Sequence, residues 1–169
     1  ALKEAHKENV YHRDVCPENI YVYEGGKAAL ANFGMAWFIE HTDLSFTISG
    51  NADISSPYTA PEVIDGDVCS SSDIFSLGVI FYELMTGKLP FDSAMTFTLG
   101  MSGKLPEDLL PCKVSKDLPK WMDEVVKKTI VGDLDQRWTS IDDVINFITS
   151  ELEKEQVASP TISHLTSTS

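Results

Sequence analysis

The chain has 169 residues, 43% of them hydrophobic, which is long and apolar enough for one domain with a hydrophobic core and excludes a disordered polymer. Asp and Glu total 26 against 13 Lys and Arg, giving a formal net charge of -13, which argues against a nucleic-acid partner. The three cysteines are widely spaced, form no disulfide or zinc pattern, and favour a reducing, cytoplasmic environment.

The sequence contains no stretch with the length of a membrane span. The longest apolar run, residues 78–85, is far shorter than the roughly 20 residues that cross a bilayer. No signal sequence is visible either, so we expect an intracellular chain with no membrane partner. The chain starts at Ala1, inside an expected helix, and not at Met, so we also expect it to be part of a longer protein.

The first expected supersecondary element is a β-hairpin. Two β-type runs, residues 19–24 and 27–32, flank a pair of glycines, a pattern typical of a tight hairpin. With the two glycines as the whole loop, Asn19 would face Asn32 across the ladder, about 5 Å away. The turn therefore predicts that two amide side chains meet at the base of the hairpin.

Helices are expected after a long connection. Residues 33–61 mix Gly, Ser, Thr, Asp and Pro without periodicity, so this segment is expected to be functional or mobile. Residues 72–86 are apolar on nearly every side and predict a buried central helix that ends at Gly87. Two amphipathic helices follow, one from Pro119 at its first turn to Gly132 and one that begins at Ser140.

The end of the sequence differs in composition from the rest. Residues 156–169 are rich in Ser and Thr and offer few apolar side chains to bury, so we expect a disordered tail or linker there. The folded domain is then expected to span residues 1–155.

Five short motifs follow one another along the chain. Residues 12–19 are HRDVCPEN, residues 32–34 are NFG and residues 60–62 are APE; residues 73–78 are DIFSLG, and Arg137 follows an acidic stretch. Their order and spacing resemble the motifs of protein kinases: the catalytic loop, the D-F-G and A-P-E motifs, the D-x-W-S-x-G helix and the arginine of the helical lobe.

The resemblance implies an α+β, protein-kinase-like fold, of which this chain is the mainly α-helical C-terminal lobe with a small β-hairpin. The N-terminal lobe, with its Gly-rich loop and strand lysine, is absent from this chain. The missing lobe of the same parent protein is therefore the first partner that the resemblance implies, beside possible protein partners or substrates. Alone, the chain would hold half of an ATP site and would expose the apolar surface that faces the other lobe.

Four positions decide the chemistry that the resemblance implies. Asp14 takes the place of the catalytic base and Asn19 that of the metal-binding asparagine. Cys16 stands where the family has a lysine that contacts the γ-phosphate, and Asn32 where it has the metal-binding aspartate. Since Mg²⁺ is normally held by one or two carboxylates, Asn19 and Asn32 would hold it weakly. ATP and Mg²⁺ are thus expected as cofactors of the intact parent, with neither bound by this chain alone.

Together the two replacements are expected to cost on the order of a thousandfold in rate. The domain therefore resembles a pseudokinase that acts as a regulatory or binding module. Two alternatives stay open: an ATP-dependent protein serine/threonine kinase of low activity, and a fragment without independent activity. Ser55, seven residues before Glu62, favours Ser/Thr over other substrates, because Ser/Thr kinases place there a threonine that contacts the catalytic aspartate.

Other motif residues have structural or regulatory roles by the same resemblance. His12 packs beneath the catalytic loop, Phe33 and Gly34 complete the D-F-G-like motif, and Asp73 begins the DIFSLG motif. Glu62 and Arg137 form a structural ion pair.

Arg13 precedes the catalytic-loop aspartate, an arrangement typical of kinases whose activation segment is ordered by a phosphate paired with that arginine. Four hydroxyls are candidate phosphate acceptors, although for each one a solvated loop hydroxyl is the simpler interpretation: Thr42, Ser45, Thr47 and Ser49.

Overall fold

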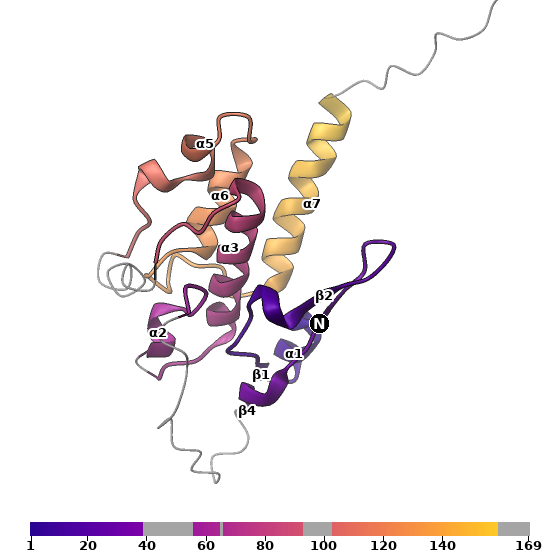
Figure 1. Cartoon of the computed structure of the whole chain (residues 1–169), viewed down its shortest axis with the longest axis vertical. Coiled ribbons are helices and arrows are strands. Elements are labelled where there is room, and N and C mark those ends of the chain that lie inside the picture. Colours follow the sequence, from indigo (N-terminus) through magenta and orange to yellow (C-terminus); the bar gives the residue numbers. More distant parts are fainter. Residues whose placement is uncertain (39–55, 65, 93–102, 159–169) are drawn as a thin grey trace, which may run out of the picture.

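Helix α3 (Ser70–Thr86) is the central element of the fold (Figure 1). The computed structural model describes residues 1–38, 56–64, 66–92 and 103–158. One face of α3 buries Phe75 and Val79 against its neighbours, and the opposite face buries Ile74 and Ile80. A helix buried on two faces needs apolar residues nearly all round, which is the pattern that predicted it.

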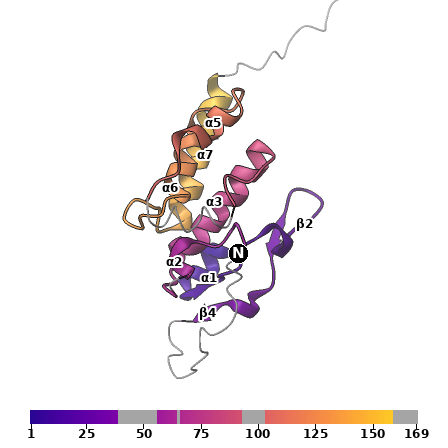
Figure 2. The same cartoon turned by 60° about the vertical axis from the view of Figure 1, so that its left-hand side comes forward.

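The remaining helices pack against these two faces. Helices α2, α5 and α6 contribute to the core on one side of α3, and α1 and the start of α7 to the core on the other (Figures 1 and 2). Their bounds are α1 (Leu2–Lys7), α2 (Pro61–Ile64), α5 (Pro111–Val114), α6 (Trp121–Thr129) and α7 (Ile141–Ala158). Short 3₁₀ turns lie at Pro17–Asn19, Phe33–Met35 and Glu107–Leu109.

The approach of α3 to α6 depends on Gly78. A Cβ atom at this position would lie 2.2 Å from Oγ1 of Thr129 and 3.2 Å from Cγ1 of Ile130. No side chain fits there, so the glycine sets how closely the two helices pack.

The expected hairpin is present, but its predicted register is wrong by one residue. Strand β2 (Ile20–Val22) pairs antiparallel with β3 (Ala28–Leu30), with Ile20 opposite Leu30. The loop has three residues in place of two, because the N–H of Tyr23 donates to the carbonyl of Lys27 at 2.8 Å. Asn19 therefore lies opposite Ala31, and the N–H of Ala31 donates to the carbonyl of Asn19 at 2.9 Å. Both loop glycines have positive φ, at 81° and 75°.

A second pair of strands was not predicted. Strand β1 (Val10–Tyr11) pairs antiparallel with β4 (Trp37–Phe38). This pairing joins the residues just before the HRDVCPEN motif to the segment after the hairpin. Helices and two small antiparallel sheets together make an α+β fold.

The predicted helices differ from the observed ones at their ends. Helix α3 begins at Ser70, two residues earlier than expected. It ends at Thr86, and the predicted stop at Gly87 is confirmed: this residue caps the helix in left-handed backbone, with φ 73°. Ser140 caps α7, because its Oγ accepts the N–H of Asp142 at 3.1 Å. Helix α7 continues to Ala158, past the expected domain end at residue 155, and the tail beyond lies outside the described residues. None of the helices in the described ranges has the length and apolarity to cross a bilayer.

Candidate active site

Asp73, buried near the start of α3, anchors the catalytic-loop backbone. Its carboxylate accepts the N–H of His12 at 2.8 Å and the N–H of Arg13 at 2.9 Å, and Nε2 of His6 lies 2.8 Å from it. Arg13 has φ 70°, a left-handed conformation that is unfavourable for a residue with a side chain. Because both amides at this turn bond to one carboxylate, Asp73 holds the loop in that conformation.

His12 joins the catalytic loop to the segment after the hairpin. Its Nε2 lies 2.9 Å from the carbonyl of Ala31, which can only accept, so Nε2 carries the hydrogen. Its Nδ1 accepts the N–H of Asp14 at 3.2 Å. The ring also packs edge-to-face against Phe33, with centroids 4.6 Å apart. With both ring nitrogens engaged and the side chain buried, the geometry suits a structural role.

Asp14 and Asn19 contact each other directly. The Asn19 side-chain Nδ2 donates to the Asp14 carbonyl at 2.7 Å and to its carboxylate Oδ2 at 2.9 Å. Asn19 is buried at 8% exposure, whereas Asp14 is half-buried. The 3₁₀ turn that begins at Pro17 brings Asn19 back over the loop.

Asn32 reaches this pair although it is not opposite Asn19 in the ladder. Its backbone is left-handed, with φ 64° and ψ 55°, and its Nδ2 donates to Oδ1 of Asn19 at 3.2 Å. Asparagine tolerates this conformation better than most residues. The two amides thus meet as predicted, through a left-handed residue and not through strand register.

Cys16 lies beside Asp14 and Asn19. Its Sγ is 3.2 Å from Nδ2 of Asn19 and 3.8 Å from Oδ1 of Asp14. Burial, with the nearby Asp14 carboxylate, raises the pKa of the Cys16 thiol to about 11. The thiol is therefore uncharged at neutral pH, where the kinase motif has a lysine.

The donor set around Asn19 does not fit Mg²⁺ well. The carboxylate of Asp14 already accepts a hydrogen bond from the side-chain amide of Asn19. The Asn19 oxygen is engaged by the Asn32 N–H, and neither of these two amides brings a formal negative charge to a cation. In the described ranges no group of three or more His, Cys, Asp or Glu side chains is arranged to hold a metal ion.

Arg13 also contacts the segment after the hairpin, since its Nη1 donates to the Met35 carbonyl at 3.3 Å. Gly34 is exposed and lies in the 3₁₀ turn Phe33–Met35, which follows Asn32. Ser55 and the candidate phosphate acceptors, Thr42, Ser45, Thr47 and Ser49, lie outside the described residues.

Glu62 and Arg137 form the expected ion pair at a separate place. Nη1 and Nη2 of Arg137 lie 2.6 and 3.1 Å from the two carboxylate oxygens of Glu62. The Arg137 side chain is completely buried and also donates to the carbonyls of Val131 and Ser71. This pair ties α2 to the start of α3 and to the segment before α7.

Two contacts near these motifs were missed by sequence reasoning. His6 contacts Asp73 from α1, and the Tyr58 hydroxyl donates to Glu83 of α3 at 2.6 Å. Burial and that carboxylate raise the pKa of the Tyr58 hydroxyl. Each contact joins residues more than 20 positions apart, so no local pattern could have indicated it.

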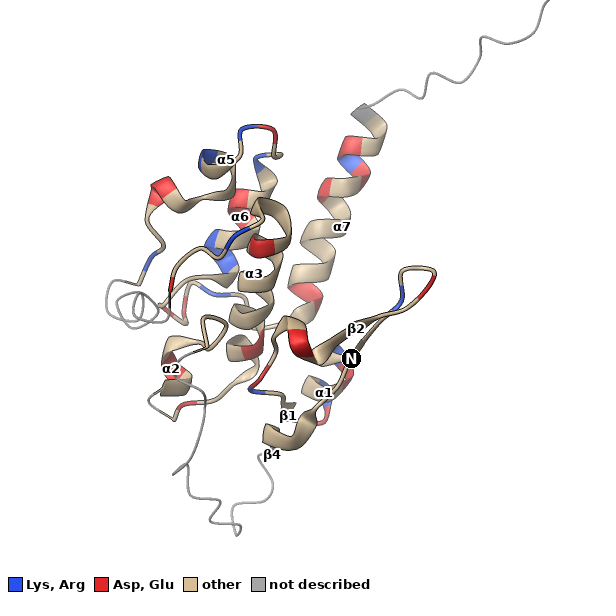
Figure 3. Ribbon diagram, in the orientation of Figure 1, with Lys and Arg blue, Asp and Glu red and all other residues tan. Residues whose placement is uncertain are grey.

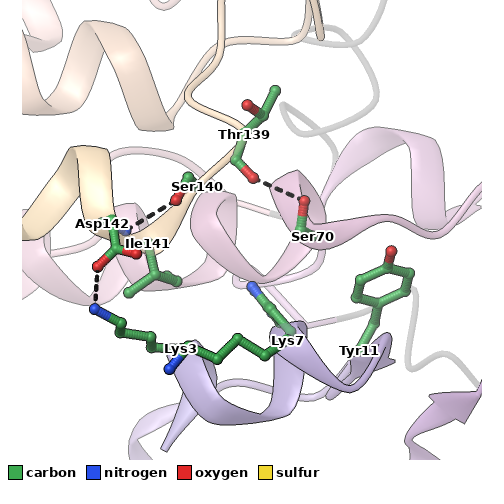
Figure 4. Close-up of a pocket in the computed structure, with 9 residues that line it drawn as sticks. Lys3, Lys7, Tyr11, Ser70, Thr139, Ser140, Ile141 and Asp142 are labelled. Atoms are coloured by element: carbon green, nitrogen blue, oxygen red, sulfur yellow. Dashed lines mark hydrogen bonds and ion pairs between the residues drawn. The ribbon is translucent and has the colours of Figure 1, made fainter.

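A cavity of about 250 Å³ lies away from the cluster, between α1 and the first turns of α3 and α7. Two polar contacts lie within its lining: Lys3 contacts Asp142, and the Ser70 hydroxyl donates to the backbone carbonyl of Thr139 at 2.8 Å (Figure 4). No residue of the Asp14 cluster lines it, so we place the candidate active site at the cluster.

Comparison with known proteins gives the family of the chain. A loop that carries an aspartate and an asparagine and is anchored by a buried aspartate at the start of a central helix is the class of site found in phosphotransferases of the kinase type. The family model described as protein kinase domain matches residues 1–165. The chain belongs to the protein kinase family.

Three relatives illustrate the similarity. A probable serine/threonine-protein kinase of Clostridium perfringens is 29% identical over 91% of this chain and 22% of its own length. Serine/threonine-protein kinase PknA of Mycobacterium tuberculosis is 34% identical over 83% of this chain and 32% of its own. The mitosis inducer protein kinase cdr2 of Schizosaccharomyces pombe is 44% identical over 54% of this chain and 12% of its own. The chain thus spans only about an eighth to a third of the length of these relatives.

Proposed function

We propose that this chain is the helical C-terminal lobe of a protein-kinase-like domain with impaired phosphotransfer, and that its parent uses the domain as a regulatory or binding module in the cytoplasm. One observation carries the proposal. At the two positions where the kinase motifs place a cation and an anion, the side chains are uncharged, and both contact Asn19.

The expected size of the defect follows from these contacts. A lysine-to-phosphate hydrogen bond is charge-assisted and contributes about 1.5–3 kcal/mol, which the Cys16 thiol does not replace. Exchange of a carboxylate for the Asn32 amide removes a formal charge from the metal ligands, at a cost of about the same size. Each ~1.4 kcal/mol is tenfold in rate, so the two losses amount to about a thousandfold or more.

The hairpin supports the proposal that another surface covers this chain. Tyr21, Val22 and Tyr23 are 54%, 75% and 59% exposed. The hairpin projects from the helices in both views (Figures 1 and 2). Neighbouring exposed apolar side chains of this size favour an interaction surface. We propose the N-terminal lobe of the same parent as its partner, because that lobe would supply the rest of the nucleotide site.

Surface charge gives no support to a nucleic-acid partner. Over the described helices, acidic and basic positions are interspersed, and α7 is predominantly acidic (Figure 3). Protein partners therefore remain our proposal.

A low-activity serine/threonine kinase is the second candidate. It is favoured by Asp14 and Asn19, which keep the catalytic-loop identities and lie in direct contact. The relatives named above are protein kinases, two of them named as serine/threonine-specific.

Radiolabelled phosphate transfer by the full-length parent tests the proposal. We expect a rate far below the roughly 1–100 per second of active kinases. The double variant Asn32→Asp plus Cys16→Lys is expected to be at least about tenfold faster than the parent protein. The matched control is Asn9→Asp plus Cys16→Met. Asn9→Asp adds the same charge at a different exposed asparagine, and Cys16→Met lengthens the side chain at position 16 without adding a positive charge. A parent that already reaches ordinary kinase rates contradicts impaired phosphotransfer and leaves the second candidate.

A further inference from the structure

The orientation of two amides in the cluster is fixed by their partners. Nδ2 of Asn19 faces the carbonyl and the carboxylate of Asp14, and both of these groups only accept hydrogen bonds. The other end of the Asn19 amide must then be its oxygen. The atom of Asn32 that lies 3.2 Å from this oxygen must in turn be a donor, Nδ2.

This orientation has a consequence for the role of a cation. If position 32 carried a carboxylate, two acceptors would face each other at that distance, and the contact would be repulsive without a cation between them. The Asn32 N–H supplies the positive end of that contact from within the protein. The Asn32–Asn19 contact is a direct hydrogen bond and needs no ion.

We propose that the Asn32 amide takes the place of a bridging cation, so that the segment after the hairpin is fastened to the catalytic loop without any divalent metal. In this protein the position of the segment is then set by protein contacts alone. A regulatory signal that moves the segment has to break those contacts and does not act through Mg²⁺ binding.

Further contacts hold the same segment along its length. The His12 ring bonds to the carbonyl of Ala31 and packs against Phe33. Arg13 donates to the carbonyl of Met35. Strand β4 pairs with β1 immediately afterwards. Each of these contacts joins residues 31–38 to residues 10–13, and none requires an ion.

The sequence offers a matched control for Asn32. Asn9 is also an exposed asparagine in left-handed backbone, with φ 55° against 64° for Asn32. Asn9→Asp therefore introduces the same charge in the same backbone conformation at a different place. Asn32→Ala removes the donor without adding a charge.

The test is thermal unfolding of the full-length protein without nucleotide, in EDTA and in millimolar Mg²⁺. We expect the midpoint of the unmodified protein to differ by less than about 1 °C between the two conditions. Asn32→Asp is expected to unfold about 4–8 °C lower in EDTA and to recover at least about half of that loss in Mg²⁺. Asn32→Ala is expected to lose about 2–4 °C equally in both, and Asn9→Asp to show no metal dependence.

Two results would overturn the proposal: a midpoint of the unmodified protein that falls on chelation, or an Asn32→Asp variant as stable in EDTA as the unmodified protein. Should that variant not accumulate as folded protein, hydrogen exchange of the unmodified protein decides. Equal protection of residues 31–38 in EDTA and Mg²⁺ supports the proposal, and loss of protection in EDTA refutes it. The inference rests on the kinase-like site proposed above, but no phosphate transfer is measured, so it can fail while impaired catalysis stands, and the reverse.

Discussion

Arg137→Met is predicted to destabilise the fold strongly, because it removes one partner of a buried ion pair. The Arg137 side chain is 0% exposed and that of Glu62 is 10% exposed. Arg137 contributes two hydrogen bonds to the carboxylate of Glu62, two to the carbonyl of Val131 and one to that of Ser71. The substitution therefore leaves a nearly buried carboxylate without its counter-charge and removes the two hydrogen bonds that Arg137 donates to the Val131 carbonyl.

The magnitude follows from that inventory. Removing one partner of a buried pair costs about 3–5 kcal/mol, and we expect Arg137→Met to lie toward the upper part of this range because the Val131 carbonyl also loses the hydrogen bonds that Arg137 donates to it. Arg137→Lys keeps the charge but loses the planar fork, so we expect a loss of about 2 kcal/mol. The exposed pair of Lys127 with Glu124 provides the control, since its side chains are 46% and 53% exposed. Lys127→Met should cost less than about 1 kcal/mol.

Urea unfolding followed by tryptophan fluorescence measures these losses, because Trp138 follows Arg137 directly in the chain. The three variants should rank in the order Arg137→Met, Arg137→Lys, Lys127→Met, with the largest loss first. A loss for Arg137→Met as small as that for Lys127→Met would refute the view that this pair holds α2 against α3.

Asp73→Asn replaces one acceptor by a donor that faces a backbone N–H, so it should cost about 2–4 kcal/mol in urea unfolding, and a loss below about 0.5 kcal/mol would contradict the anchoring role of Asp73. Gly78→Ala places a methyl group against Thr129 and should cost about 3 kcal/mol in the same assay; a neutral result would mean that α3 and α6 separate easily. Cys16, with its pKa of about 11, should react with iodoacetamide at pH 8 about 100-fold more slowly than a thiol of pKa 9, its rate rising with pH to about 11 in mass-spectrometric labelling. A Cys16 rate that levels off near pH 9 would show that the thiol ionises normally.

Much of the helical part of the fold could be predicted because its signals are local. The apolar run that ends at Gly87 specified α3, and Ser140 marked the start of α7. The juxtaposition of Glu62 and Arg137 came only from the family resemblance, since 75 residues separate them.

The hairpin shows why other features could not be predicted. Two adjacent glycines suit a two-residue loop, but they also suit a three-residue loop, and the register depends on which one packs better. The side chain of Asn32 reaches Asn19 despite the shifted register because the Asn32 backbone is left-handed. No sequence pattern indicates this conformation in advance. Strands β1 and β4 have two residues each, too few to show any alternation.

The site could be predicted as a set of residues but not as a set of bonds. The sequence motifs named Asp14, Asn19 and Asn32 together. They did not indicate that Asn32 would direct its nitrogen at Asn19, because that choice depends on what Asn19 donates to. The orientation of the Asn32 amide decides whether two acceptors face each other in the cluster, and so whether a cation is needed between them.

The most direct measurement of the central claim is a thermal-shift titration of the full-length protein with ATP, in EDTA and in Mg²⁺. If the cluster binds the metal weakly because the side chains at positions 16 and 32 are uncharged, any stabilisation by ATP will be nearly the same in both conditions, whereas Asn32→Asp plus Cys16→Lys will gain a magnesium-dependent shift. A large magnesium-dependent gain in the unmodified protein would contradict the account.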